Sequence, residues 1–162
     1  MRIAIVIQRY GLDIVGGAEY HAREVAEHLN KYFPVEVLTT CAKDYRSWSN
    51  EFKEGNEFIN GVMIRRFKNN KERPIDLHRD IEEKVFYKSH NKDDEIKWID
   101  AQGPYCPDLI EYIKLNKNDF DCFIFFTFRY YTSYYGIRAA CEKSFLAPLA
   151  EDDPALALET TK

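Results

Sequence analysis

Residues 3–40 read IAIVIQRYGLDIVGGAEYHAREVAEHLNKYFPVEVLTT, and within this stretch the apolar pattern changes from strand to helix and back. The continuous apolar run over residues 3–7 is typical of a central strand in a parallel sheet that is covered on both faces. Residues 8–17 predict a loop, and apolar residues then recur at helical spacing from Ala18 to Leu29. Phe33-Pro34 ends this helix because proline lacks an N–H group, and residues 35–40 predict the next strand. The stretch therefore predicts a βαβ unit.

The rest of the chain continues this alternation. Further strands are predicted over residues 61–67, 121–128 and 145–149. Helices are predicted around residues 77–85, with an interruption at residues 91–95, around residues 109–113, and over residues 130–142. Residues 41–60 show no clean period and predict an excursion between sheet elements rather than core. We therefore expect an α/β fold, a Rossmann-like, doubly wound, mostly parallel sheet with helices on both faces, in which residues 1–162 form a single domain that stops while the sheet is still growing.

Composition and charge exclude several classes of protein. Hydrophobic residues make up 45% and charged residues 31% of the chain, which is ordinary for a soluble globular protein. The net charge of −4 gives no general attraction to nucleic acid. No apolar run is long enough to span a bilayer or to act as a signal peptide, so we expect a cytoplasmic protein with at most peripheral membrane association. The four cysteines lie far apart, without a CxxC pair or a histidine at ligand spacing, so neither a disulfide framework nor a metal site is expected.

Gly16 and Gly17 stand directly before the first predicted helix. Glycines allow close approach to the backbone, and the free N–H groups of a helix start form an anion site. The pair therefore predicts a diphosphate site, and a flexible turn that only admits the chain to the helix is an equal alternative on this context. A nicotinamide site needs G-x-G-x-x-G and an acidic residue near the end of the second strand. Gly11 lies too far from Gly16 and the second strand ends without a carboxylate, which leaves a nicotinamide-dependent oxidoreductase or a sugar-nucleotide epimerase as a distant third hypothesis.

Aromatic residues make up 15% of the chain and gather around the end of the strand predicted at residues 121–128. Open α/β sheets bind ligands at the carboxyl ends of their strands, so rings placed there predict a surface on which a sugar stacks. The alternative is a helix start that packs against a neighbouring domain. The residues of this aromatic group are Trp98, Phe126, Phe128, Tyr130, Tyr131, Tyr134 and Tyr135, and the turn Gln102-Gly103-Pro104 accompanies them.

Charged and titratable residues near the expected strand ends are further candidates. Glu151-Asp152-Asp153 follows the last predicted strand, where carboxylates bind a sugar hydroxyl, a proton or a divalent ion. Because consecutive residues rarely converge on one ion, a solvated acidic turn is the favoured interpretation. Glu19 is predicted to cap the first helix, and His21 and His28 are predicted to lie on solvated surface.

An ordered series of segments resembles one family. The N-terminal part of the series is similar to the first half of family-four retaining glycosyltransferases, and the later part resembles a bacterial subgroup of that family. The early segments are Gly16-Gly17-Ala18-Glu19-Tyr20-His21 with Leu29, Val35-Glu36-Val37-Leu38-Thr39-Thr40, Asp44-Tyr45, Trp48, Gly61-Val62 and Arg65-Arg66-Phe67. The later ones are Gln102-Gly103-Pro104-Tyr105, Phe123-Ile124-Phe125-Phe126-Thr127, Tyr130-Tyr131 and Gly136.

The resemblance implies the GT-B architecture, in which two Rossmann-like domains face a cleft. This chain would be the acceptor-side domain, and the C-terminal donor-binding domain would be absent from it. Transfer in the family retains the anomeric configuration without a metal, so the resemblance implies a nucleotide-sugar co-substrate and no cofactor. It implies that Gly16 and Gly17 approach the donor diphosphate and that the loop over residues 8–15 borders a saccharide or lipid-linked acceptor. The expected acceptor contacts are Tyr10, Tyr130, Tyr131 and Asp152.

One residue departs from the family pattern. The subgroup commonly has a His-Asp-Glu-Pro-like turn where this chain has residues 151–154, so Glu151 stands at the histidine position and is the candidate catalytic residue. A glutamate accepts a hydrogen bond from a sugar hydroxyl but donates one only when it is protonated. The leading hypothesis is therefore an acceptor-side glycosyltransferase domain with little or no activity by itself. The alternative is a non-catalytic module that binds a saccharide or a protein.

Overall fold

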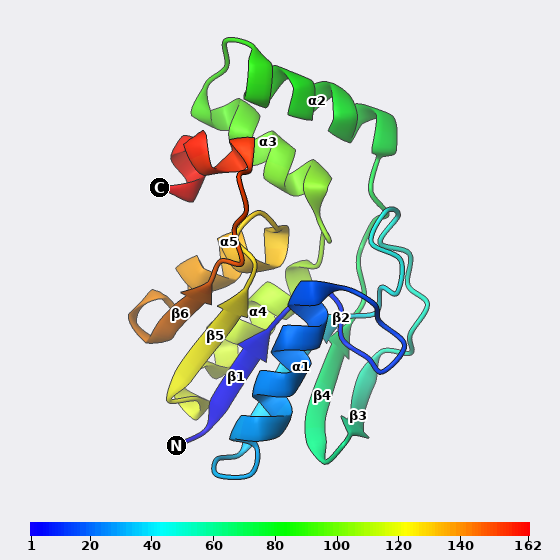
Figure 1. Cartoon of the computed structure of the whole chain (residues 1–162), viewed down its shortest axis with the longest axis vertical. Helices are drawn as coiled ribbons and strands as arrows, with labels where there is room; N and C mark the ends of the chain where they lie inside the picture. The colour runs from blue at the N-terminus through cyan, green and yellow to red at the C-terminus, as the bar shows by residue number, and fades with distance from the viewer.

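A six-stranded sheet with the order β3-β4-β2-β1-β5-β6 forms the centre of the structure, a computed structural model that describes residues 1–162 (Figure 1). All neighbouring strands pair in parallel except β3, which pairs antiparallel to β4 at one edge. The strands are β1 (Ile3–Val6), β2 (Val35–Thr40), β3 (Gly55–Ile59), β4 (Val62–Phe67), β5 (Cys122–Phe126) and β6 (Ser144–Ala147). The predicted α/β, Rossmann-like, mostly parallel sheet is confirmed.

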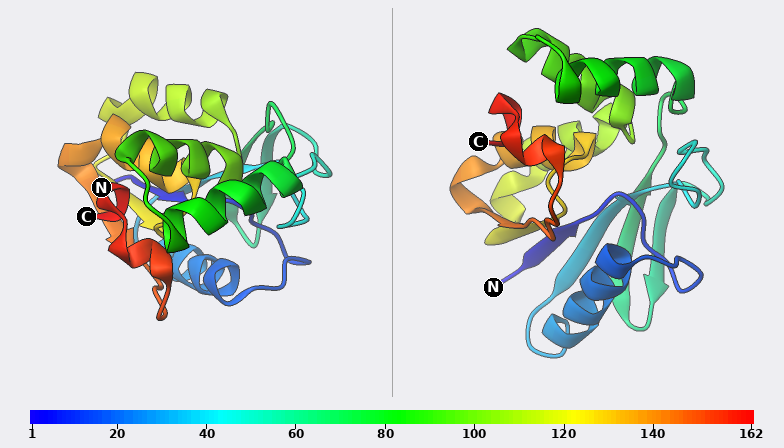
Figure 2. Two further views of the ribbon diagram at one scale, coloured as in Figure 1. Left: turned by 90° about the horizontal axis from the view of Figure 1, so that it is seen from above. Right: turned by 45° about the horizontal axis from the view of Figure 1, so that its top comes forward.

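Helices flank the sheet on both faces and at its carboxyl edge. Figure 1 shows α1 on one face, α4 and α5 on the opposite side, and α2 and α3 beyond the carboxyl ends of the strands. Seen from above in Figure 2, α2 and α3 lie side by side over that edge, and the two helices pack against each other. The helices are α1 (Gly17–Leu29), α2 (Ile75–Tyr87), α3 (Lys92–Gln102), α4 (Pro107–Asn116) and α5 (Tyr131–Ala139), with the short 3-10 turns η1 (Lys117–Asp119), η2 (Cys141–Lys143), η3 (Pro154–Ala157) and η4 (Glu159–Thr161).

The alternation of side chains along the strands divides the core in two. Ile5 of β1 points to the face covered by α1, where it shares a buried cluster with Ala22 and Ala26. Val6 points to the other face and belongs to the cluster that also contains Phe125 and the apolar sides of α3, α4 and α5. Successive strand residues point to opposite faces of a sheet, so complete burial of β1 requires helices on both sides.

Two stretches differ from the sequence prediction. Within residues 41–60, predicted to lie outside the core and the sheet, Gly55–Ile59 form the edge strand β3 and the indole of Trp48 is buried. The hydrophobic pattern does not predict β3, because an exposed edge strand carries polar residues rather than an apolar run. The break between α2 and α3 lies at residues 88–91 instead of 91–95, because Asn91 and Asp94 form a capping box that starts α3.

The last residues of the chain dock on α3 through one buried carboxylate. Glu95 accepts hydrogen bonds from the backbone N–H groups of Glu159 at 3.1 Å and Thr160 at 2.8 Å, and its Oε1 lies 3.1 Å from Nε2 of His90. Burial by itself raises the pKa of Glu95, but the two N–H groups and His90 together hold that pKa below its ordinary value. The ionised form of Glu95 therefore holds η4 in place.

We expect Glu95→Gln to release the tail, because an amide accepts these hydrogen bonds less strongly than a carboxylate. The pKa of Glu95 is lower in the folded state than its unfolded value of about 4.3, so the ionised carboxylate contributes its full stabilisation above about pH 4.3. This stabilisation is lost as the pH falls through the folded-state pKa. The protection of the Thr160 amide from hydrogen exchange, taken relative to its intrinsic rate at each pH, should therefore fall in the unsubstituted protein only in acid, and already at neutral pH in Glu95→Gln. The free energy of unfolding should fall by about 1–3 kcal/mol. Glu111→Gln, at an exposed position of α4, is the control, and equal exchange in both variants would contradict this account.

Candidate functional site

The candidate site lies at the carboxyl edge of the sheet, where the loops that follow β1, β5 and β6 are neighbours because these strands are adjacent and parallel. The connection after β1 leads to α1 on one face, whereas the connection after β5 leads to α5 on the other. The strand order therefore reverses between β1 and β5. Open α/β sheets bind ligands in the crevice that such a reversal leaves at the carboxyl ends of the strands.

The glycine pair opens α1 at this crevice. α1 begins at Gly17 without a side-chain cap, and the first hydrogen bond of the helix runs from the N–H of Tyr20 to the carbonyl of Gly16 at 2.9 Å. The backbone N–H groups of Gly17 and Ala18 make no hydrogen bond within the chain. A Cβ built on Gly17 would meet no atom within 4 Å, so the start of the helix is open to solvent. These free donors and the positive end of the helix dipole favour an anion there.

Glu19 does not cap the helix, and this prediction from the sequence is wrong. Its carboxylate is buried, and Oε1 accepts hydrogen bonds from Nε of Arg9 at 2.9 Å and Nη2 of Arg9 at 2.6 Å. Gln8 contributes a further contact, from Nε2 to the same oxygen at 3.3 Å. A Cβ on Gly16 would collide with Oε2 of Glu19. Gly16 is therefore needed to make room for the buried ion pair, which ties the loop after β1 to the first turn of α1.

The floor of the crevice is polar. Oγ1 of Thr127 donates to Oε1 of Gln8 at 3.3 Å, and Oγ1 of Thr40 donates to the backbone carbonyl of Gln8 at 2.7 Å, so the ends of β1, β2 and β5 are joined at one residue. Thr127 has a φ of 68°, in the left-handed region that a β-branched residue rarely adopts. Strained backbone of this kind is concentrated at binding sites, where the surrounding structure holds it in place.

The predicted acceptor contacts separate into buried and accessible residues. Tyr10 is completely buried in the core beneath α1, and burial raises the pKa of its hydroxyl far above the ordinary value. Tyr131 is buried among the rings of Tyr105, at 4.8 Å, and Tyr135, at 4.5 Å between centroids. Neither side chain is accessible to an acceptor, so the prediction that Tyr10 and Tyr131 contact the acceptor is wrong. Tyr130 is half-buried and remains accessible at the end of β5.

Most of the predicted aromatic group belongs to the core. Trp98 and Phe126 are fully shielded from solvent, and Tyr134 is buried as well, so these residues cannot provide a stacking surface for a sugar. His21 lies on the surface as predicted, with its ring edge-on to Phe126 at 5.4 Å between centroids. No sequence pattern distinguishes the buried rings from the accessible ones, because an aromatic residue near a strand end fits a core and a binding surface equally well.

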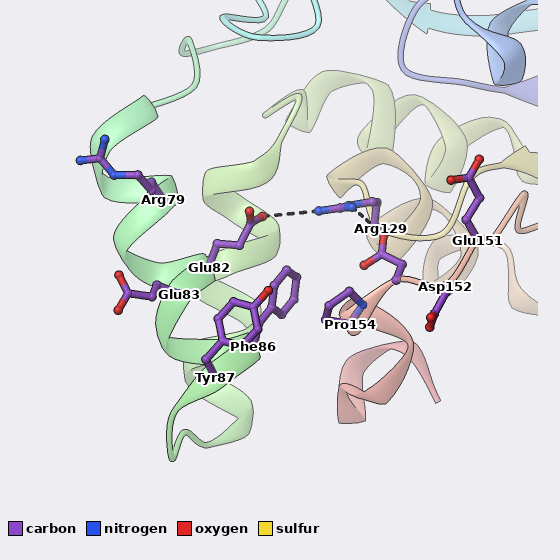
Figure 3. Close-up of a pocket in the computed structure, with 10 residues that line it drawn as sticks. Arg79, Glu82, Glu83, Phe86, Tyr87, Arg129, Glu151, Asp152 and Pro154 are labelled. Carbon is purple, nitrogen blue, oxygen red and sulfur yellow. Dashed lines mark hydrogen bonds and ion pairs between the residues drawn. The ribbon is translucent and has the colours of Figure 1, made fainter.

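The acidic turn after β6 borders a groove of about 420 Å³ that lies between α2 and the segment leading to η3 (Figure 3). Asp153 is not a solvated residue, because its carboxylate accepts from Nη1 of Arg129 at 2.6 Å and from the N–H of Ala155 at 2.9 Å. Glu151 and Asp152 are exposed, and Figure 3 shows their carboxylates pointing away from each other. Glu151 also lines a smaller cavity of about 170 Å³ with Tyr130. The three carboxylates thus do not converge on one point.

Arginines that the sequence analysis did not single out organise the site. Arg129 reaches Asp153 and also Oε2 of Glu82, at 3.4 Å, so it joins the end of β5 to α2 and to the chain after β6 (Figure 3). Arg73 lies over the ring of Trp48, and that ring meets Tyr130 edge-on. No local sequence pattern marks these residues, because their partners are remote in the chain.

Comparison with known proteins adds no family assignment. The chain matches no protein-family model, and a search of curated proteins gives no significant match. No helix has the length and apolar character that a membrane span requires. No group of three or more His, Cys, Asp and Glu side chains is arranged to hold a metal ion.

Gly16 and Gly17, the glycine hinge before α1, should differ in how much stability the protein loses when each is replaced by alanine. Gly16→Ala would force the carboxylate of Glu19 away from Arg9, and we expect the free energy of unfolding to fall by about 1–3 kcal/mol. Gly17→Ala adds a methyl group in open space, so stability should be unchanged or increase by up to about 1 kcal/mol. Urea unfolding of both variants measures the difference, and equal losses would show that the ion pair does not determine the choice of glycine at position 16.

Proposed function

We propose that the chain is the acceptor-side domain of a nucleotide-sugar-dependent, retaining glycosyltransferase of the GT-B architecture, which extends a saccharide or glycolipid. One observation carries the proposal: the uncapped start of α1 at Gly17 lies open at the crevice between β1 and β5. The ordered sequence resemblance to family-four glycosyltransferases supports it. A doubly wound fold by itself hosts many functions, so the proposal depends on this site rather than on the fold.

The open helix start suits the leaving group of glycosyl transfer. Cleavage of a nucleotide-sugar releases a nucleoside diphosphate, whose charge grows as the bond to the sugar breaks. The N–H groups of Gly17 and Ala18, with roughly half an elementary positive charge at the helix end, stabilise that charge. In the GT-B architecture a second domain supplies most donor contacts, so residues 1–162 by themselves should bind diphosphate weakly.

On the acceptor side we retain Tyr130 and Asp152, whose side chains are accessible. Glu151 lines one cavity with Tyr130 and the groove with Asp152, at the position where the resemblance places a histidine. As a carboxylate it accepts a hydrogen bond from a sugar hydroxyl and so holds the acceptor or the transferred sugar in place. It requires no metal for this role.

The diphosphate site is tested with Gly17→Glu and its neutral partner Gly17→Gln. The space beside Gly17 is open and a carboxylate at the start of a helix is favourable, so neither variant should be less stable than the unsubstituted protein. We expect uridine and guanosine diphosphates to shift the amide resonances of residues 17 and 18, and Gly17→Glu to weaken this response by at least about tenfold, since like charges repel. Gly17→Gln, which adds similar bulk without charge, should lose less.

An unchanged response in Gly17→Glu would exclude the helix start as the diphosphate site. Turnover provides a separate check of the two-domain proposal, with a panel of nucleotide-sugars and a saccharide mixture as substrates. We expect residues 1–162 to release little nucleoside diphosphate, because stabilisation of the leaving group requires both sides of the cleft. Robust release would contradict the two-domain proposal.

A non-catalytic saccharide-binding module is the second candidate. It is favoured by Glu151, an exposed carboxylate at the histidine position with no hydrogen-bond partner in the chain. Binding of saccharides without any response to diphosphates at residues 17 and 18 would support the module and reject the transferase.

A further inference from the structure

Arg73 differs from every other arginine of the chain that is shielded from solvent. It is half-buried in the segment that joins β4 to α2, and it has no carboxylate within ion-pair distance. The remaining arginines without a carboxylate partner, Arg46 and Arg138, are exposed at the surface. The shielded arginines that do form ion pairs are Arg2 and Arg65 with Glu36, Arg9 with Glu19, Arg23 with Glu27, Arg66 with Glu57, and Arg129 with Glu82 and Asp153.

The partners that Arg73 does have are neutral. Its Nε and Nη2 both donate to the backbone carbonyl of Gln102, at 3.0 and 2.8 Å, and its guanidinium lies over the ring of Trp48 at 4.9 Å. That carbonyl also accepts from Nε1 of Trp48 at 2.7 Å, so a single oxygen serves three donors. Gln102 ends α3, and a helix end supplies only roughly half an elementary negative charge. Nη1 of Arg73 makes no hydrogen bond and is not sealed from solvent.

Glu82, one of the carboxylates nearest to Arg73, is already engaged by other donors. Its Oε2 accepts from Nε1 of Trp98 at 3.1 Å and from Nη2 of Arg129 at 3.4 Å, and it lies 3.3 Å from Nε2 of His78. The rotation that would bring Glu82 to Arg73 would therefore leave Nε1 of Trp98 without its acceptor and would take from Arg129 one of its two carboxylate partners. Burial and the neighbouring positive charge of Arg129 lower the pKa of Arg73, whereas Glu82 acts in the opposite direction without contact.

Asp44, the other nearby carboxylate, is used to shape the loop after β2. Its Oδ2 accepts from the N–H of Ser47 at 2.7 Å, the hydroxyl of Ser47 at 2.8 Å and the N–H of Arg46 at 3.2 Å. The backbone N–H of Arg73 in turn donates to the carbonyl of Ser47 at 2.7 Å. The loop thus fixes the position of Arg73 but leaves its charge without a counter-ion.

Arg73 lies close to the candidate site, because its guanidinium stacks on Trp48 and Trp48 in turn meets Tyr130. Arg73 follows β4, Trp48 follows β2 and Tyr130 follows β5, so all three lie beyond the same carboxyl edge of the sheet, the edge over which Figure 1 shows α2 and α3. The rings of Trp48 and Tyr130 meet edge-on at 5.6 Å. Trp48 is buried and serves as the support for Arg73, whereas Tyr130 is the ring that a ligand can reach.

We propose that Arg73 binds the anionic group, a carboxylate or a phosphate, of the acceptor saccharide, whose sugar ring packs on Tyr130. The free Nη1 and the planar fork of an arginine suit either group. The identification of the ligand as the acceptor rests on the proposed function, whereas the preference for an anionic sugar rests on Arg73 alone. The acceptor is thus an acidic or phosphorylated saccharide, and neutral sugars are poor ligands.

The test is a titration of the full chain, followed by amide resonances, with glucuronate, glucose 6-phosphate and glucose as probes. We expect at least one of the charged sugars to bind about tenfold or more tightly than glucose, because charge-assisted hydrogen bonds are roughly twice as strong as neutral ones. The two charged probes separate a carboxylate site from a phosphate site. Inorganic phosphate as a fourth probe should bind more weakly, since it has no ring to pack on Tyr130.

Arg73→Gln should abolish the preference for charged sugars, Arg73→Lys should keep most of it, and Arg138→Gln is the control at an exposed arginine. Arg73→Lys retains the charge, so the proposal stays testable if Arg73→Gln does not fold. Equal binding of glucose and the charged sugars, or an unchanged preference in a folded Arg73→Gln, overturns the proposal. Diphosphate shifts at residues 17 and 18 in the same samples report on the transferase proposal separately, so the failure of one is distinguishable from the failure of the other.

Discussion

The structure depends on β1 lying hydrogen-bonded in parallel between β2 and β5. Parallel strands need crossover connections, and these connections are almost always right-handed. Crossovers that add strands on the β2 side of β1 therefore cover one face of the sheet, and those that add strands on the β5 side cover the opposite face. α1 and α5 lie on opposite sides for this reason. The same constraint opens the crevice at the carboxyl edge, which brings the glycine hinge, the end of β5 and the turn after β6 to one place.

Charge pairing then determines the shape of this edge. The buried carboxylates of Glu19 and Glu95 both hold connecting segments, the first by an ion pair with Arg9 and the second by two backbone N–H groups. Removing one partner of a buried pair leaves a charge without compensation, which is far more costly than the pair is stabilising. A half-buried arginine with only neutral partners is therefore an exception within this protein, and the exception lies where a ligand is expected.

Local patterns predicted most elements but not the composition of the site. The strands with continuous apolar runs and the start of α1 were predictable because burial on both faces and a glycine hinge leave signals within a few residues. The edge strand β3 and the burial of Trp48 were not, since neither has such a signal. Among the tyrosines, the side chains of Tyr10 and Tyr131 face the core, while that of Tyr130 faces the crevice. The three residues have the same chemistry, and only the direction in which the backbone points each side chain distinguishes them.

The sequence by itself determined the α/β class, the order of the central elements and the glycine hinge, because hydrophobic period and glycine geometry act over short stretches of chain. Only the tertiary structure decided which charges are paired and which side chains are accessible. The hydrogen bond from Thr127 to Gln8 joins residues 119 positions apart, and that from Trp48 to Gln102 joins residues 54 apart. Contacts across such separations depend on the register and twist of the whole sheet, so they leave no trace in any local pattern.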